Sequence, residues 1–465
     1  MNKDCKKETQ STIDFIIFGA TGDLAHKKLF PSLFNLYKDF KFKEKIKILA
    51  LGRSPQSSEE FVKRFDDTIA QSTQRDDFYK IIEYFPCDFT NIDELKKLKD
   101  KLDAACASRI FYLAIPPLIY PDVISNLESV GLNKTCDTHS TFSRVILEKP
   151  FGEDLESSKK LNKIILSGFQ ENQIYRIDHY LGKEPVQNIF SFRFANNTFE
   201  NIWDCKYVDN IQIRILEDMG IEGRGEFYDS TGALVDVFQN HALQMLSILT
   251  MDKPKEFEEN YIREEKNTLL KSLVFKDCIK GQYEGYTSED KVSPDSKRET
   301  YVAVKLEIAN ERWDKVPIFI ETGKYLNERR TEISVVMKKN KDKLFKGNSN
   351  NNVLKFLIYP DLGIELKLLG KVPTFSNYEV TDIDMKYKYS NFFGELKSEY
   401  EKLLIDCIQG EQINFTRSDE IENAWVLVDS IQKEIKDKTP IIYPKSSKGP
   451  KETIALLKKD TLYWV

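Results

Sequence analysis

The stretch that decides the fold runs from Asp14 to Ala25 and reads DFIIFGATGDLA. Its first five residues have the composition of a buried strand, and a glycine turn follows at once. Residues 26–38 then predict a helix that is interrupted at Pro31. Strand, glycine turn and helix in this order form the context of a dinucleotide-binding fingerprint, although the spacing departs from G-x-G-x-x-G. Glycines allow backbone N–H groups to approach a pyrophosphate at the helix N-terminus.

The second predicted strand, residues 47–51, is followed by Gly52, Arg53 and Ser54. An enzyme that uses NAD carries an acidic residue at this place, where it binds the ribose hydroxyl. An arginine suits the 2′-phosphate of NADP instead. The alternative is an ordinary solvated loop arginine, and the position at the carboxyl end of a strand favours the coenzyme.

Strands and helices alternate through the first 177 residues. Further strands are predicted at residues 82–85, 109–115, 143–147 and 173–177, with helical patterns between them. This alternation indicates a Rossmann-type α/β domain with a parallel sheet, which we assign to residues 1–177. Ligands bind at the carboxyl ends of the strands in such a sheet. Four candidate residues fall at these ends: Arg53, Pro117, Lys149 and Asp178.

Composition excludes several classes of protein. The chain has 69 basic and 74 acidic residues and a net charge of −5, a balance that argues against a nucleic-acid surface. Seven cysteines form no CxxC pair, so neither a disulfide framework nor a zinc site is indicated. Residues 1–10 are polar, and no apolar run is long enough to cross a membrane. We therefore expect a cytoplasmic protein without a membrane partner.

The segment from Arg176 to Glu184 reads RIDHYLGKE and contains one of only four histidines. If a helix begins at Tyr180, His179 and Lys183 share one of its faces. An imidazole, a phenol and an ammonium together would suit a phosphate dianion. Asp178 precedes them and could orient a different base. A surface turn of mixed charge is the alternative on spacing alone.

After residue 184 the pattern changes to short segments of period two, among them residues 189–194, 210–216, 300–308, 317–321, 332–338, 353–359 and 364–368. Helices are predicted at residues 235–249, 260–273, 394–407 and 419–434. We therefore expect a second, α+β domain with a large, mostly antiparallel sheet over residues 178–465. Its candidate residues are Glu217, Asp236, His241, Lys324 and Arg329. The alternative for His241 is a buried histidine of the core. The alternative for Lys324 and Arg329 is a solvated loop face.

The motifs in their order closely resemble the glucose-6-phosphate dehydrogenase family. The resemblance covers nearly the whole chain and rests on the glycine turn and on residues 148–152, 176–184, 193–196, 222–225, 239–241, 311–314, 323–324 and 327–329. It implies oxidation of glucose 6-phosphate at carbon 1 with NADP as the coenzyme. It also implies a homodimer or homotetramer that assembles through the large sheet.

The resemblance assigns roles to single residues. His241 is implied as the general base and Asp178 as the carboxylate that orients its imidazole. The implied substrate-binding residues are Lys149, His179, Tyr180, Lys183, Glu217, Asp236, Lys324 and Arg329. The implied coenzyme-binding residues are Gly19, Thr21, Gly22, Asp23, Leu24, Lys28, Arg53, Pro117 and again Lys149. No metal is expected.

The sequence departs from the family in three places. His26 replaces a lysine after the glycine turn, and Leu357 and Tyr359 replace the usual arginine and glutamine on one strand. Animal members hold a second, structural NADP, and three of its arginine positions here are Glu321, Ser334 and Leu357. Arg330, Lys367 and Trp464 remain of that set. We therefore expect one NADP per subunit.

Two other functions compete with this interpretation. One is an oxidoreductase for a free sugar, which would not need the phosphate ligands Lys183, His179 and Lys324. The other is an NADPH-sensing binding protein without activity, for which the intact Asp178 and His241 would be unnecessary.

Overall fold

The structure is a computed structural model that describes residues 12–39, 46–103, 107–134, 141–340, 344–347, 350–373, 378–458, 462 and 464–465. The polar N-terminal stretch, residues 1–10, lies outside the described residues, as do Cys5, Cys106 and Cys136. The cysteines that are described, Cys87, Cys205, Cys278 and Cys407, are free thiols. Within the described residues, no helix is long and apolar enough to span a membrane.

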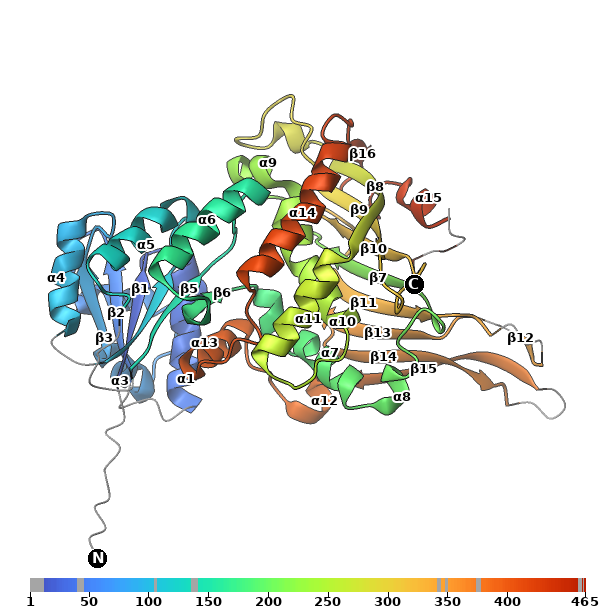
Figure 1. Cartoon of the computed structure of the whole chain (residues 1–465), viewed down its shortest axis with the longest axis horizontal. Helices are drawn as coiled ribbons and strands as arrows, with labels where there is room; N and C mark the ends of the chain where they lie inside the picture. Colours follow the sequence, from blue (N-terminus) through green and yellow to red (C-terminus); the bar gives the residue numbers. More distant parts are fainter. Residues whose placement is uncertain are drawn as a thin grey trace, which may run out of the picture. The chain divides into compact units, whose positions relative to one another are not determined.

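Two compact units make up the chain. The first contains residues 1–152, 156–182 and 397–418, and the second contains residues 153–155, 183–396 and 419–465. Residues 178–182 and 397–418, which we expected in the second domain, therefore belong to the first unit. Each unit is built around its own sheet (Figure 1).

The first unit is a parallel, doubly wound sheet, as predicted. Its six strands lie in the order β3-β2-β1-β4-β5-β6. Their bounds are β1 Ile13–Phe18, β2 Ile46–Gly52, β3 Ile82–Pro86, β4 Ser108–Leu113, β5 Ser143–Leu147 and β6 Ile174–Arg176. The strand order reverses between β1 and β4, and such a switch point is where doubly wound sheets bind ligands.

Helices cover both faces of this sheet because alternate residues of each strand are apolar on both sides. Phe15 and Ile17 of β1 pack in one core and Ile16 and Phe18 in another. The first core is closed by α1 Phe30–Asp39, α2 Ser58–Val62, α3 Thr73–Lys80 and α13 Glu399–Gln409. The second core is closed by α4 Ile92–Asp103, α5 Tyr120–Ser129 and α6 Leu155–Gly168.

The second unit contains the large sheet, which has ten strands in the order β12-β15-β14-β13-β11-β7-β10-β9-β8-β16. Most neighbours are antiparallel, while β7–β10, β12–β15 and β8–β16 run parallel. The bounds are β7 Val208–Leu216, β8 Leu273–Tyr283, β9 Tyr301–Ile308, β10 Ile318–Gly323, β11 Arg330–Met337, β12 Lys346–Gly347, β13 Val353–Tyr359, β14 Gly363–Lys371, β15 Glu379–Lys388 and β16 Ile441–Tyr443. Helices pack on it, among them α7 Glu184–Phe194, α9 Gly225–Ala233, α10 Leu243–Thr250, α11 Glu259–Lys271 and α14 Ser418–Ile435 (Figure 1).

Residues 189–194 were predicted as a strand, and that prediction is wrong. They form the second half of α7, whose buried residues include Val186, Ile189, Phe190 and Arg193. Their spacing is that of one helical face, and Pro185 stands in the first turn, where proline is tolerated.

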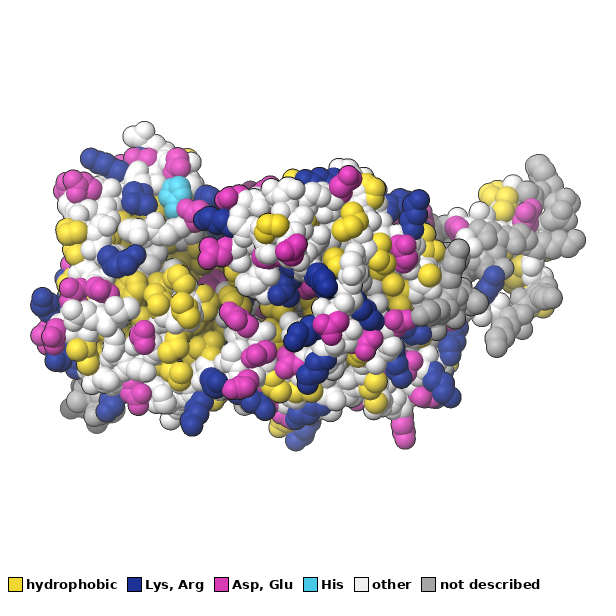
Figure 2. Space-filling view, turned by 90° about the horizontal axis from the view of Figure 1, so that it is seen from above, with side chains coloured by type: hydrophobic (Ala, Val, Ile, Leu, Met, Phe, Trp, Pro, Cys, Tyr) yellow, Lys and Arg dark blue, Asp and Glu magenta, His cyan; other side chains and the backbone are white. Residues whose placement is uncertain are grey.

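Charged side chains of both signs are mixed on the face drawn in Figure 2. Lysine and arginine alternate there with aspartate and glutamate, and the described residues of this face form no broad area of a single sign. This surface agrees with the nearly balanced composition.

Candidate active-site residues

The glycine turn lies at the carboxyl end of β1, at the switch point of the first sheet. Gly19 has φ +75°, and a Cβ there would lie 2.4 Å from the carbonyl oxygen of Ala114. Only glycine fits this position. The Gly22 N–H donates to Gly19 O at 3.0 Å, which closes the turn. A Cβ at Gly22 would meet nothing but that oxygen, at 3.3 Å, so the turn is open on its outer side and fits a pyrophosphate.

Three residues next to the turn make contacts within the protein. His26 Nε2 lies 2.6 Å from Arg64 O and 3.0 Å from an Asp67 carboxylate oxygen. The imidazole that replaces the family's lysine therefore connects the turn to the segment after α2. Asp23 pairs with Lys27 on the surface, and Leu24 packs against the first core.

Arg53 directly follows β2, and its side chain is exposed. The pKa of Asp88 is lowered by hydrogen bonds from Thr90 and, to a smaller extent, by the charge of Arg53. A guanidinium that is exposed at this strand end is available to a 2′-phosphate. Lys28 lies 3.8 Å from the Glu399 carboxylate of α13.

The ends of β5 and β6 bring the next candidates together. The two strands are parallel neighbours with Leu147 opposite Arg176, so Lys149 and Asp178 follow at the same edge of the sheet. Asp178 is 3% exposed, and its Oδ1 accepts the Tyr180 N–H at 2.9 Å. Pro117, at the end of β4, begins a short 3-10 helix over Pro117–Ile119.

The segment after Asp178 does not begin an α-helix at Tyr180, which was the condition for a shared face of His179 and Lys183. Residues His179–Gly182 form a 3-10 turn, and Lys183 is the extended N-cap of α7. His179 and Lys183 therefore do not share a helical face, because Lys183 has left the helical conformation. The rings of His179 and Tyr180 lie 5.0 Å apart, between centroids.

In the second unit, Glu217 and Lys324 lie side by side because β7 and β10 are parallel, with Leu216 opposite Gly323. Lys324 is 2% exposed, and its Nζ donates to Glu217 Oε2 at 2.5 Å. Asp236 Oδ2 lies 4.0 Å from the same ammonium, and the Tyr228 ring lies 5.0 Å from it. Burial, followed by the charges of Asp236 and Glu217, raises the pKa of Tyr228. The ammonium is thus held next to the two predicted hydroxyl acceptors.

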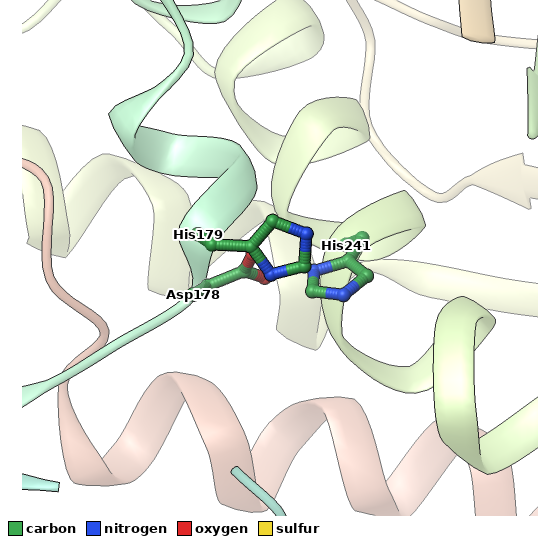
Figure 3. Close-up of side chains that lie close together, drawn as sticks. All are labelled: Asp178, His179 and His241. Atoms are coloured by element: carbon green, nitrogen blue, oxygen red, sulfur yellow. The ribbon is translucent and has the colours of Figure 1, made fainter. Parts of the chain in front are cut away.

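His241 lies on a π-helical segment, η6 Leu234–Ala242, that continues into α10. Its side chain is 3% exposed, and its backbone N–H donates to Asn240 Oδ1 at 2.7 Å. Such wide turns are frequent at functional sites. Figure 3 draws His241 together with Asp178 and His179, which come from the turn after β6.

Arg329 is exposed, and its guanidinium lies 4.6 Å from the centre of the Tyr359 ring. Tyr359 is the residue that replaces the family's glutamine. The guanidinium of Arg329 therefore contacts the face of this ring.

Comparison with known proteins agrees with this geometry over the whole chain. The family described as "Glucose-6-phosphate dehydrogenase, NAD binding domain" matches residues 16–188, and "Glucose-6-phosphate dehydrogenase, C-terminal domain" matches residues 190–465. The chain belongs to the glucose-6-phosphate dehydrogenase family. Membership confirms the predicted family and the predicted fold of both domains, together with a nicotinamide-binding first domain.

Individual members of the family are similar over their full length. The glucose-6-phosphate 1-dehydrogenases of Borreliella burgdorferi and Bacillus subtilis are each 40% identical to this chain. The alignments cover 98% of both chains for the first and 99% of both for the second. A solved glucose-6-phosphate dehydrogenase in complex with glucose 6-phosphate is 33% identical, with a TM-score of 0.91 over 98% of this chain and 99% of that one.

Sequence reasoning overlooked two groups around the candidates. Glu148 was noted only as part of a motif, yet its carboxylate accepts hydrogen bonds from Tyr112 and Tyr400. Tyr443 donates to the carbonyl of Lys324 at 2.7 Å from a strand 119 residues further along the chain. The acidic residue at the end of an apolar strand was a signal for Glu148, whereas nothing in the sequence pointed to Tyr443.

The first turn of α13 is a further feature that was not expected. It contacts three segments of the first unit that carry candidate residues. Glu399 faces Lys28, and its backbone oxygen would lie 2.6 Å from a Cβ at Gly182. Tyr400 reaches Glu148 at 3.3 Å, and Glu401 accepts from Asn35 at 3.0 Å. This turn therefore fixes the glycine-turn helix, the end of β5 and the 3-10 turn together.

Proposed function

We propose that this enzyme oxidises D-glucose 6-phosphate at carbon 1 to 6-phospho-D-glucono-1,5-lactone with NADP as the coenzyme. The observation that carries the proposal is the match of both domains to one family. The solved relative with glucose 6-phosphate bound supports the choice of substrate.

The residues of the chain fit a nicotinamide dinucleotide. The open glycine turn lies at the switch point between β1 and β4, and the exposed Arg53 follows β2. When bound, the nicotinamide would supply the acceptor for the hydride that leaves carbon 1. The position of Arg53 supports a preference for NADP over NAD.

The protein supplies the general base and the charged side chains that bind the substrate. His241 takes the proton of the carbon 1 hydroxyl, and Asp178 holds the imidazole in the required tautomer and stabilises the imidazolium. The electron pair of that O–H bond forms the lactone carbonyl as hydride leaves. Both side chains are buried. Glu217 and Asp236 accept hydrogen bonds from sugar hydroxyls, and Lys324, which lies next to both carboxylates, is assigned to the phosphate.

The remaining substrate residues are assigned to the phosphate. His179, Tyr180 and Lys183 follow Asp178 directly in the chain, and Lys149 contacts both substrate and coenzyme. Pro117 and Lys28 complete the coenzyme residues. Arg329 keeps its assignment to the substrate as a proposal, although its contact in the structure is with Tyr359. We also infer a cytoplasmic homodimer or homotetramer, as the resemblance implies.

Absorbance of reduced nicotinamide decides between the functions. Purified protein is mixed with glucose 6-phosphate or with glucose, and with NADP or NAD. Reduction that requires the phosphate ester supports the proposal, and equal rates on both sugars would favour the free-sugar oxidoreductase. No reduction under any condition, with NADPH still bound, would indicate the binding protein.

His241→Asn tests the base. The variant should bind both ligands, while turnover falls about 10²–10⁴-fold, the usual contribution of a positioned base. Turnover equal to that of the wild type would refute the assignment of His241.

A further inference from the structure

Asn240 lies between two proposed active-site residues and has no assigned role. It belongs to η6, four residues after Asp236 and directly before His241. Its amide nitrogen donates to the carbonyls of Val235 at 3.1 Å and Asp236 at 3.2 Å, and its Oδ1 accepts the His241 N–H at 2.7 Å. The side chain thus uses both of its N–H groups and its oxygen within a single turn.

This set of bonds goes beyond the usual contact of a polar side chain inside a helix. Such side chains commonly bond to the carbonyl four residues earlier, as the Thr250 hydroxyl does with Leu246 at 2.7 Å. Asn240 makes such a bond and also reaches the carbonyl five residues earlier and the N–H of the next residue. Asparagine is a weak helix former, so helix propensity does not explain its place in the middle of this helical stretch. The three bonds fit a side chain that fastens the turn.

The π-helical conformation decides which side chains of η6 share a face. The Leu243 N–H donates to the carbonyl of Phe238, five residues earlier, as well as to a nearer one. Bonds over this spacing place residues five positions apart about one turn from each other. Asp236 and His241 have this spacing, whereas in an α-helix of 3.6 residues per turn they would point about 140° apart. The wide turn therefore brings the two side chains to one face of the segment.

We propose that Asn240 is a positioning residue of the active site, whose amide holds the wide turn and thereby keeps Asp236 and His241 on one face. The inference rests on the proposed function, in which Asp236 accepts a sugar hydroxyl and His241 takes the proton at carbon 1 of the same sugar. A π-helical stretch is rare, and the α-helix is its common alternative. Without the amide bonds the segment rewinds toward an α-helix, which turns His241 away from Asp236.

The first arm of the test measures kcat and KM for glucose 6-phosphate. Asn240→Leu keeps the branched shape of the side chain and removes all three hydrogen bonds. Its kcat/KM should fall about 100-fold, the effect of a small misplacement of reacting groups. The fall should appear in both kcat and KM, because the base and a substrate-binding group move together. Values equal to those of the wild type would overturn the proposal.

Thr250→Val is the matched control. Thr250 lies on α10, which continues directly from η6, and valine removes its bond to a carbonyl while keeping its shape. This variant should keep the kcat and KM of the wild type. A loss as large as that of Asn240→Leu would show that any broken side-chain bond in this helix disturbs the site, and would contradict a specific role of Asn240.

A double variant shows whether Asn240 acts through the base. In the His241→Asn background, Asn240→Leu should lower kcat no further, because the base that it would misplace is already absent. KM should still rise, because Asp236 is still displaced. A full additional loss of kcat in this background would mean that Asn240 acts independently of His241 and would refute the positioning role.

The second arm observes His241 directly and needs no turnover. The chain has four histidines, so protein labelled in histidine gives few imidazole NMR signals, and His241→Asn and His26→Asn assign two of them. Asn240→Leu should shift the His241 signal and leave that of His26, on the glycine-turn side of the other unit, in place. Thr250→Val should move neither. An unchanged His241 signal, or equal shifts of both signals, would overturn the proposal.

Asn240→Ser keeps the test decisive if the leucine variant does not fold. Its hydroxyl retains one bond of the kind that Thr250 makes, so its loss of kcat/KM and its shift of the His241 signal should be smaller than complete but clearly present. Wild-type values for both would count against the proposal. If the wild type does not oxidise glucose 6-phosphate, the proposed function fails, while a shift of the His241 signal in Asn240→Leu alone still supports the hold on the turn. An active wild type with an unmoved His241 signal in every Asn240 variant would refute this inference and leave the proposed function intact.

Discussion

The buried ion pair between Lys266 and Glu420 offers a sharp test of what holds the second unit together. Lys266 Nζ lies 2.8 Å from Glu420 Oε2, and both side chains are 0% exposed. Gln244 Nε2 donates to the same oxygen at 3.4 Å. The pair joins α11 to α14, and Gln244 adds α10, the helix that continues from the segment of His241.

The magnitude follows from this geometry. Two unit charges 2.8 Å apart attract by about 6 kcal/mol at an effective dielectric constant of about 20. Desolvation costs several kcal/mol for each ion, so the intact pair contributes little net stability. Lys266→Met leaves the Glu420 carboxylate buried without its cation and should destabilise the helices by about 3–5 kcal/mol. The double variant Lys266→Met with Glu420→Leu should recover most of this loss, because no charge stays buried.

Hydrogen exchange of peptides from α10, α11 and α14 is the suitable assay, since a protein of two units need not unfold in one step. Protection in Lys266→Met should fall about 100- to 5,000-fold, the equivalent of 3–5 kcal/mol. Lys438→Met is the control, because its pair with Glu434 is exposed at 48% and 54% and should contribute only about 0.3–0.5 kcal/mol. A fall below tenfold in Lys266→Met, or a double variant as unprotected as the single one, would refute the reasoning.

Three further predictions concern ligands. Lys183→Ala should weaken glucose 6-phosphate by about 1.5–3 kcal/mol more than glucose, through loss of a charge-assisted bond to the phosphate, and equal losses in inhibition or binding assays would remove Lys183 from the phosphate site. Arg53→Ala should raise KM for NADP far more than KM for NAD, because NAD lacks the 2′-phosphate; an unchanged ratio of the two KM values would contradict this. Calorimetry should find one NADP per subunit, since Glu321 pairs with Arg214 at 2.7 Å where an arginine would be needed; two bound NADP, one of them retained in Arg53→Ala, would disprove it.

Local signals made the first sheet predictable. Strand, turn and helix follow one another within residues 14–38, and Gly19 is required by the approach of a neighbouring backbone. Residues 189–194 were misassigned because a short apolar run fits either period, and only with Val186 included does the helical face become visible. A helix that begins at Tyr180 was the condition for a shared face of His179 and Lys183, whereas α7 begins at Glu184, with Pro185 in its first turn.

The contacts between the candidate residues were harder to predict from the sequence. The pairing of Glu217 with Lys324 depends on parallel strands that are more than 100 residues apart in the chain. The contacts of Glu148 with Tyr400 join residues 252 positions apart. No sequence period carries information over such separations, because these contacts arise from the packing of whole elements.

The return of residues 397–418 to the first unit has a consequence for synthesis on the ribosome. Arg144 donates to the carbonyls of Cys407 and Ile408, and Gln412 donates to the carbonyl of Ile174, so this late segment completes the hydrogen bonds of early strands. The first unit can therefore reach its final packing only when more than 200 further residues have been translated, a delay of roughly 10–50 s. Nascent chains that stall before residue 397 should keep residues 12–182 sensitive to protease, and chains that extend well beyond residue 418 should protect them.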